Sequence, residues 1–233
     1  MKKVVVALLM AAIVTGGAFA IDLSAGIGGA FSGIFQTYNW TDDGKDFLDA
    51  FDIEKDAFNQ NNIGGGFFAY FDASYVMLSF GMSFFDNSPA NKDAKKWMDD
   101  NKIKNSATFI DIGLYGKFPI DLDGLTLFPM LGGEVKLPIA MATTVDGEKF
   151  KYTNDDGDEV SPMPDHTTLW LKVGVGADIP LSEQMYLRFM GLYGIGTLGK
   201  LTQEAMDEDN KDTKFYSILN HGFDLKVAIG FKF

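Results

Sequence analysis

The feature that most constrains the fold of this chain is an alternation of apolar and polar residues with a period of two. It recurs in eight segments, at about 21–37, 63–73, 76–84, 108–118, 125–137, 169–179, 187–195 and 223–233. In the last segment, Phe223, Leu225 and Val227 alternate with Asp224 and Lys226. Successive side chains of a β-strand point to opposite faces, so this pattern predicts strands with one apolar and one polar face. The sequence therefore predicts an all-β protein of eight strands.

The connections between these segments alternate between long and short. Those at 39–62, 86–105, 138–166 and 197–218 are long, whereas those near 73, 121 and 182 are tight turns. Long extracellular loops and short periplasmic turns are typical of membrane-embedded up-and-down barrels. Strands can cross hydrocarbon only as a closed sheet, because every backbone N–H and C=O must find a partner within the protein. We therefore expect a closed antiparallel membrane barrel with four long loops and three short turns.

The first twenty residues have the composition of a cleaved secretory signal peptide. Lys2 and Lys3 form a basic start, residues 4–14 are continuously apolar, and Ala18 and Ala20 supply small residues at positions −3 and −1 of a cleavage site. A helix over 4–14 would be about 16 Å long, about half of a hydrocarbon core, which argues against a membrane anchor. We expect residues 1–20 to be a signal peptide and residues 21–233 to be one barrel domain.

The polar faces of the predicted strands carry equal numbers of acidic and basic residues. An aqueous sheet face needs no such balance, but a narrow lumen does, because an unpaired charge away from water is costly. The balance favours a lumen over a soluble β-sandwich or a lipocalin-like barrel, in which the apolar faces would form the core. We expect nine of these charged residues to form an ion-pair network in the lumen, with Lys232 pairing with Asp22 where the first and last strands meet. The nine are Asp22, Asp111, Glu134, Lys172, Asp178, Arg188, Asp224, Lys226 and Lys232. The acids are Asp22, Asp72, Asp111, Glu134, Asp178 and Asp224, and the bases are Lys117, Lys136, Lys172, Arg188, Lys226 and Lys232.

Large side chains on the same faces are expected to fill the lumen. An eight-stranded barrel has an interior just wide enough for side chains, so such residues argue against a continuous pore. The glycines Gly26, Gly28, Gly64, Gly65 and Gly66 lie in strands, where a tightly curved wall leaves no room for a side chain. The inward-pointing large residues are predicted to be Phe68, Tyr70, Tyr115, Phe128, Trp170, Tyr186 and Arg188.

The C-terminal segment resembles the signal by which outer-membrane barrels are recognised for insertion. It has apolar residues at every second position and ends in phenylalanine, at Leu225, Val227, Ile229, Phe231 and Phe233. With the signal peptide and the strand number, the mature chain resembles the small eight-stranded outer-membrane proteins, the group of OmpX, OmpW and the OmpA membrane domain. It is also similar to small spirochaetal barrels of unassigned role. The resemblance implies a monomer in outer-membrane lipid, inserted by the barrel-assembly machinery through its last strand.

Three classes of function are compatible with such a barrel. The long loops suit adhesion or the binding of an extracellular ligand, whereas a narrow channel or transporter would need an open lumen. Some barrels of this size modify lipid A, and Asp165, His166 and Thr168 are candidates for a catalytic group, but no serine lies at a matching spacing. The formal charge of −12 becomes −14 when Lys2 and Lys3 are removed, which disfavours nucleic acid. We expect a surface-interaction barrel that is not an enzyme and has no cofactor or metal.

Three local patterns complete the expectations. The acidic runs 154–159 and 207–209 lack the ligand spacing of a calcium-binding EF loop and are interpreted as solvated. A short helix is expected between Ser88 and Asn101, capped by Ser88, with Ala94, Trp97 and Met98 on one side. Pro129 lies within a predicted strand, where we expect a β-bulge or a lost ladder hydrogen bond. The other six prolines fall in loops or at strand ends: Pro89, Pro119, Pro138, Pro162, Pro164 and Pro180.

Overall fold

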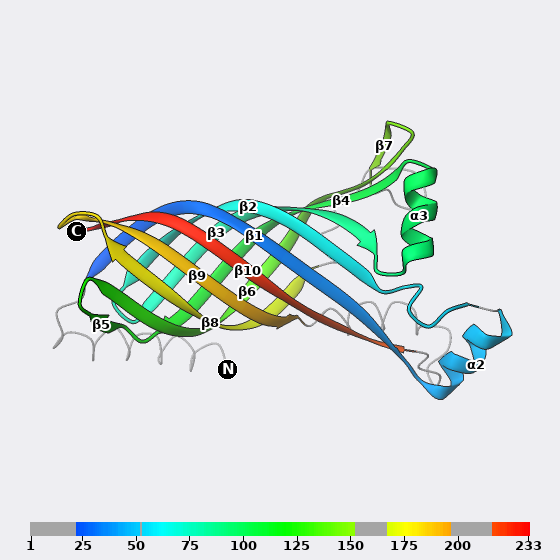
Figure 1. Ribbon diagram of the computed structural model, residues 1–233, viewed down its shortest axis with the longest axis horizontal. Helices are drawn as coiled ribbons and strands as arrows, with labels where there is room; N and C mark the ends of the chain where they lie inside the picture. Colours follow the sequence, from blue (N-terminus) through cyan, green and yellow to red (C-terminus); the bar gives the residue numbers. More distant parts are fainter. Residues whose placement is uncertain (1–21, 52, 152–166, 197–215) are drawn as a thin grey trace, which may run out of the picture.

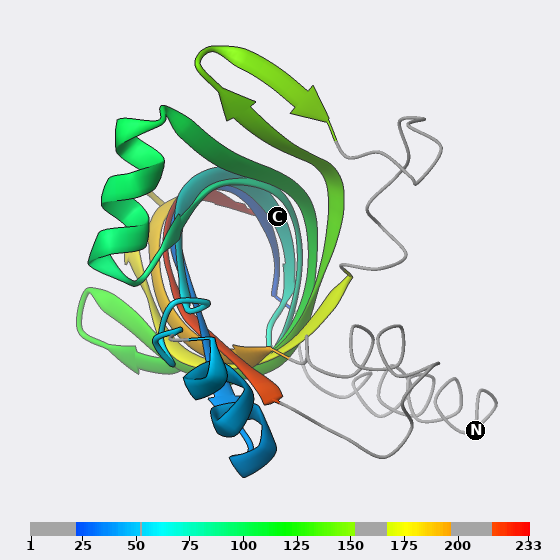
Figure 2. The ribbon, with the colours of Figure 1, turned by 90° about the vertical axis from the view of Figure 1, so that its right-hand side faces the viewer.

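The computed structural model describes residues 22–51, 53–151, 167–196 and 216–233, so the predicted signal peptide lies outside it. Eight antiparallel strands form a closed ring in the order β1-β2-β3-β4-β6-β8-β9-β10, with β10 returning to β1 (Figures 1 and 2). The predicted fold is thereby confirmed. The ring strands are β1 Leu23–Trp40, β2 Gln60–Ala73, β3 Val76–Pro89, β4 Ile103–Lys117, β6 Leu125–Val145, β8 Thr168–Pro180, β9 Met185–Gly196 and β10 Tyr216–Lys232.

The two ends of the barrel differ as the connection lengths predict. At the periplasmic end, β2 and β3 are joined through Ser74 in the left-handed region (φ 50°), and β5 (Ile120–Leu122) pairs with the start of β6. At the extracellular end, the chain adds helix α2 (Asp42–Ala50), helix α3 (Lys92–Asp100) and strand β7 (Glu148–Lys151), which pairs with β6. Figure 1 shows α2, α3 and β7 together at the end opposite the C-terminus.

The apolar faces of the strands point outward, as expected for a barrel surrounded by lipid. Ile27 is 70% exposed and Leu171 is 65% exposed, whereas the neighbouring Lys172 is only 3% exposed. A soluble barrel would place these apolar side chains inside, so the alternative of a lipocalin-like fold is excluded. In the part of the chain described here, no helix has the length and apolarity needed to span a bilayer.

Several boundaries differ from the sequence-based expectation. The 39–62 connection, predicted as a polar loop, contains α2, whose N-cap Thr41 accepts a hydrogen bond from the N–H of Gly44 at 3.3 Å. Helix α3 begins at Lys92 with Asn91 as its N-cap, so the prediction of Ser88 as the cap is wrong. Ser88 instead belongs to β3, where it pairs with Asn61.

Of the two alternatives predicted at Pro129, the β-bulge does not occur. The register between β6 and β8 continues without a shift through Pro129, which lies opposite Val175. The carbonyl of Pro129 accepts a hydrogen bond from the N–H of Phe118 at 3.0 Å. In an antiparallel strand, the N and the C=O of one residue point toward the same neighbouring strand. The nitrogen of Pro129, which has no hydrogen to donate, therefore faces the chain just beyond the end of β4 at Lys117.

The bulge occurs instead near Pro138, which was predicted to begin a loop. Phe109 of β4 pairs with Pro138, whereas Thr108 pairs with Ala140, so Ile139 is the extra residue. Strand β6 continues past this bulge to Val145, which makes it 21 residues long. The longest strand of the barrel is therefore bent at a proline rather than ended by it.

Candidate functional site

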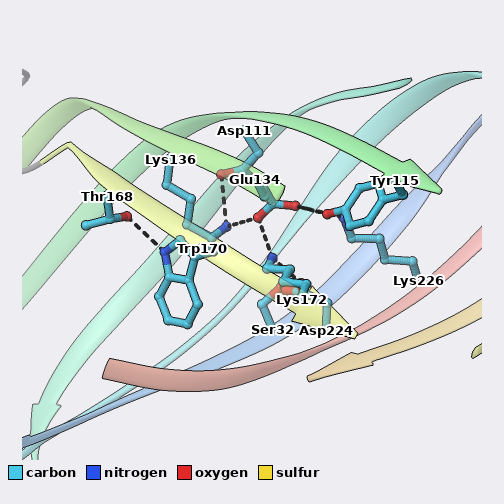
Figure 3. A network of polar contacts seen from close by, with 10 residues as sticks. All are labelled: Ser32, Asp111, Tyr115, Glu134, Lys136, Thr168, Trp170, Lys172, Asp224 and Lys226. Atoms are coloured by element: carbon cyan, nitrogen blue, oxygen red, sulfur yellow. Dashed lines mark hydrogen bonds and ion pairs between the residues drawn. The ribbon is translucent and has the colours of Figure 1, made fainter. Parts of the chain in front are cut away.

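The centre of the lumen holds a cluster of charged side chains around Glu134 of β6 (Figure 3). Glu134 is 1% exposed and forms ion pairs with Lys172, with Lys136 at 3.2 Å and with Lys226 at 3.4 Å. The hydroxyl of Tyr115 donates a hydrogen bond to Glu134 Oε2 at 2.7 Å. One carboxylate thus contacts three ammonium groups from three different strands.

Two further acids complete the charge balance around these lysines. Lys172 Nζ lies 2.5 Å from Asp224, which also accepts a hydrogen bond from the hydroxyl of Ser32 at 2.5 Å. Lys136 Nζ donates a hydrogen bond to Asp111 Oδ1 at 2.9 Å. Three acids and three bases from β4, β6, β8 and β10 therefore meet in the middle of the barrel, away from bulk water (Figure 3).

A second cluster lies nearer the periplasmic end and is built around Arg188 of β9. Its guanidinium forms two parallel hydrogen bonds to Asp178, from Nε at 2.7 Å and from Nη2 at 2.6 Å. Nη1 lies 2.7 Å from Asp72 Oδ2, and Lys117 Nζ lies 2.6 Å from the same oxygen. Two acids and two bases therefore neutralise each other in this cluster, and Arg188 provides the bidentate geometry that lysine lacks.

Aromatic rings enclose the Arg188 guanidinium. Its carbon lies 4.5 Å from the ring centre of Tyr70, 4.8 Å from that of Phe128 and 5.1 Å from that of Tyr186. Tyr70 donates a hydrogen bond to Tyr186 Oη at 2.9 Å, and Tyr186 shares another with Ser24 at 2.7 Å. The seven large side chains predicted to point inward are all at most 5% exposed. We call these residues and the two charged clusters the plug.

Glycines on the inward face leave the space that the plug occupies. A Cβ on Gly26 would lie 2.6 Å from the ring of Tyr70, and a Cβ on Gly230 would lie 2.2 Å from the ring of Tyr186. Such distances do not occur between real atoms without a shift of one of them. The two glycines therefore allow the tyrosines to lie across the lumen.

Asp22 and Lys232, which were predicted to pair with each other, do not. Both are exposed at the periplasmic end, and the described residues include no ion pair between them. Lys232 lies opposite Ser24 in the register, and its ammonium is 5.9 Å from the ring centre of Tyr186. Water solvates both groups at this end, so pairing brings little gain. The ion pairs of the plug thus leave out Asp22 and Lys232 and include Asp72, Lys117 and Lys136, which were not among the residues predicted for the network.

Above the plug, the lumen widens into two cavities that we call the vestibule. The inner cavity has a volume of about 240 Å³, and Trp170, Phe85 and Lys136 contribute to its lining. The outer cavity has a volume of about 610 Å³ and extends between the ends of β2, β3, β4 and β6. Tyr38, Gln60, Asn87 and Met141 line both cavities.

A group of amide side chains, here called the amide belt, lies at this level on adjacent strands. The register places Gln36 opposite both Asn220 and Gln60, and Asn87 opposite both Asn62 and Asn105. These residues were not predicted as site residues. Ser32, Phe68 and Asp224 point inward. Counting every second residue from them toward the extracellular end would have placed Gln36, Asn62 and Asn220 on the inner face. The amide belt consists of Gln36, Gln60, Asn62, Asn87, Asn105 and Asn220.

The rim around the vestibule is held by contacts between the extracellular elements. The side-chain amide of Asn91 donates hydrogen bonds to Glu54 at 2.7 Å and to Asp56 at 3.2 Å, which joins α3 to the β1–β2 connection. Trp40 Nε1 donates a hydrogen bond to the carbonyl of Lys55 at 2.9 Å. The ring centres of Trp40 and Tyr216 are 5.1 Å apart. These contacts join β1, the β1–β2 connection, α3 and the start of β10 within the described part of the rim.

The remaining candidate residues do not form a site in the structure as described. Asp165, His166 and the acidic runs 154–159 and 207–209 lie outside the described residues. Thr168 accepts a hydrogen bond from Trp170 Nε1 at 2.9 Å, and His221 Nδ1 lies 3.2 Å from the hydroxyl of Tyr193. Among the described ranges there is no group of three His, Cys, Asp or Glu side chains that could hold a metal ion.

The molecule combines an apolar outer face, a charged and filled lumen, and long connections at one end. The chain is an eight-stranded outer-membrane β-barrel. No protein-family model matches its sequence, and no curated protein matches it. Among solved structures, it is similar to the attachment invasion locus protein Ail of Yersinia pestis, with 13% identity over 92% of this chain and 100% of that chain (TM-score 0.42). It is also similar to neisserial surface protein A, with 10% identity over 90% and 99% (TM-score 0.44).

Proposed function

We propose that this barrel is a surface-interaction protein that binds an extracellular ligand at its vestibule and rim and has no continuous pore. The observation that carries the proposal is the filled plug. A cavity of only about 10 Å³ remains beside Asp111, Lys136, Asp224 and Lys226. This volume is about that of one water-sized probe. Solutes larger than water therefore have no path through this level, whereas the described residues at the extracellular end line a cavity of about 610 Å³.

The assembly of the barrel is part of the same proposal. The outward residues of β10 that resemble the insertion signal are exposed along one face, with Leu225 at 55%, and Phe233, which follows the strand, is 82% exposed. We propose that the barrel-assembly machinery binds this face before β10 closes against β1. The folded barrel is then a monomer, because the ring leaves no unpaired strand edge.

The experiment that tests the proposed function is the conductance of the purified, folded protein in planar lipid bilayers. We expect no steady conductance, with a general porin inserted into the same bilayers as the positive control. Stable single-channel steps carried by this protein would overturn the proposal and favour the narrow channel. If substitution of Glu134 then abolished these conductance steps, the ions would be shown to pass through the plug.

The binding part of the proposal is tested on cells that display the protein. Replacing 42–50, the residues of α2, by a flexible linker of the same length should reduce adherence of these cells to epithelial layers. A Gly29→Ala variant is the matched control, because Gly29 lies in the lipid-facing wall and a Cβ there meets only the carbonyl of Gly66 at 3.8 Å. Equal adherence of cells with and without the protein would contradict a role in adhesion.

A further inference from the structure

The amide belt contains buried polar atoms that have no partner among the described residues. Asn220 is 0% exposed, and neither its amide nitrogen nor its amide oxygen forms a hydrogen bond there. Asn62 is 8% exposed and lines the inner cavity, with its amide oxygen also unpartnered. Buried polar groups in folded proteins are nearly always satisfied, so the unpartnered amide oxygen of Asn62 in the wall of the inner cavity indicates a missing hydrogen-bonding molecule. The fully buried Asn220 lines neither cavity.

The charge of the inner cavity limits the kind of molecule that fits. Lys136 is the one charged residue among those lining it, and its ammonium is already bound to Asp111 at 2.9 Å and Glu134 at 3.2 Å. An anionic ligand would have to compete with these carboxylates, and a cationic ligand would meet no free acid. The described lining therefore favours an uncharged ligand.

The side chains of the vestibule define the ligand further. Each Asn or Gln amide offers two donors and one acceptor, which suits a molecule with several hydroxyl groups. Tyr38, Phe85 and Trp170 add aromatic surface to the same cavity. A purely apolar molecule would leave the amides unsatisfied, whereas a sugar ring has hydroxyls at its edge and C–H groups on its faces. Small-molecule sites measure about 300–1,000 Å³, so the outer cavity of about 610 Å³ falls within this range and the inner cavity of about 240 Å³ lies just below it.

We propose that the vestibule binds a neutral saccharide, with one sugar unit in the inner cavity and the next in the outer cavity. The inference rests on the proposed extracellular binding function and names its ligand class. The amides of Gln60 and Asn87, which line both cavities, bind hydroxyls of both units. The aromatic residues of the inner cavity lie against the ring of the first unit.

Trp170 provides a fluorescence readout, because it lines the inner cavity. The chain contains two other tryptophans, Trp40 and Trp97, and replacing both by phenylalanine leaves Trp170 as the sole emitter. The folded variant is titrated with neutral mono- and disaccharides, with glucuronate and glucosamine as charged counterparts. Each neutral sugar is used both free and coupled to a carrier protein, which separates a free solute from a surface glycan as the source. We expect a saturable change with at least one neutral disaccharide and a weaker response to charged sugars.

Adjacent residues of β2 supply a matched pair of variants. Asn62 points into the lumen, whereas Asn61 is exposed on the outer side of the wall. Asn62→Ala should weaken binding by about tenfold or more, and Asn61→Ala should leave it unchanged. Ala142→Phe, which fills part of the outer cavity, should block the disaccharide while the barrel still folds. Retained mobility of the unheated protein on gels verifies folding of each variant.

Two results would overturn the saccharide site. The first is that no neutral sugar alters the fluorescence emission of Trp170. The second is that Asn61→Ala weakens sugar binding as much as Asn62→Ala does. Neither result affects the bilayer measurement. Absence of sugar binding together with absence of conductance removes only the ligand assignment, whereas steady conductance removes the proposed function itself.

Discussion

The plug and the vestibule are built by the same strands but solve the burial of polar groups differently. Strand β2 carries Asp72 in the plug and Asn62 in the vestibule, and β10 carries Asp224 and Asn220 in the same order. In the plug every buried charge has an opposite charge within 3.4 Å. In the amide belt, the amide oxygen of Asn62 and both amide atoms of Asn220 have no hydrogen-bond partner among the described residues. The free-energy cost of burying an unpaired charge is much larger than that of burying an unpaired amide. A buried amide can therefore remain without a hydrogen-bond partner until a ligand binds.

The largest effect is expected from removing the central acid of the plug. Glu134→Leu leaves Lys136, Lys172 and Lys226 with one carboxylate fewer, so the free energy of unfolding should fall by about 3–5 kcal/mol. Urea unfolding in detergent micelles measures this change. Glu148→Leu on the exposed β7 is the control and should alter stability by at most about 0.5 kcal/mol.

The double variant Glu134→Met/Lys172→Met sharpens the same test. It removes one charge of each sign, so most of the stability lost in the single variant should return. If the double variant is less stable than Glu134→Leu, the loss comes from packing around residue 134 rather than from unpaired lysines.

The second prediction compares two buried residues of the same strand. Asp72→Leu removes the shared acid of Lys117 and Arg188 and should cost about 3 kcal/mol. Asn62→Leu removes an unpartnered amide, so stability should stay the same or rise by up to about 1 kcal/mol. Both are measured by urea unfolding. Equal losses at the two positions would erase the distinction between plug and vestibule.

A smaller effect is expected when the charge is kept but its geometry changes. Arg188→Lys retains the positive charge and loses the two parallel hydrogen bonds to Asp178, so we expect a loss of about 2 kcal/mol. Thermal unfolding followed by circular dichroism measures it, with the exposed Lys232→Arg as the control. No loss at Arg188 would mean that net charge alone stabilises the plug.

The smallest effect concerns an ion pair in water. At the start of α2, the hydrogen bond from Lys45, together with its charge, lowers the pKa of the Asp42 carboxyl below its ordinary value. The pair is therefore formed above that ordinary value and is lost as the pH falls through the lowered pKa. Carboxyl-carbon NMR should show the low midpoint, and Lys45→Ala should raise it toward the ordinary value. Global unfolding should not change measurably, because both groups are exposed.

The sequence was sufficient for the part of the barrel that faces lipid. There, outward residues such as Phe67 and Leu171 must be apolar, so the alternation is strong. Above the membrane, the outward residues Asn61 and Ser88 are polar, and the alternation vanishes although the strand pairing continues. This explains why the predicted strands were too short and why the amide belt was missed.

The charged residues of the plug could be recognised from sequence, but their partners could not. Glu134 of β6 meets Lys226 of β10 across the lumen, 92 residues further along the chain. Such pairs depend on the tilt and stagger of the strands, which period-two alternation does not encode. Asp22 and Lys232 show the same limit: both belong to the inward pattern, but the strands end before either is enclosed.

Strand β1 is 18 residues long, which has a consequence for reach. At about 3.4 Å per residue and a tilt of about 40°, it rises about 45 Å along the membrane normal, against an apolar band of about 25 Å. About 20 Å of hydrogen-bonded wall therefore stands outside the hydrocarbon, more than the thickness of one headgroup layer. The share of this wall on the extracellular side can be contacted by a macromolecule without its entering the hydrocarbon.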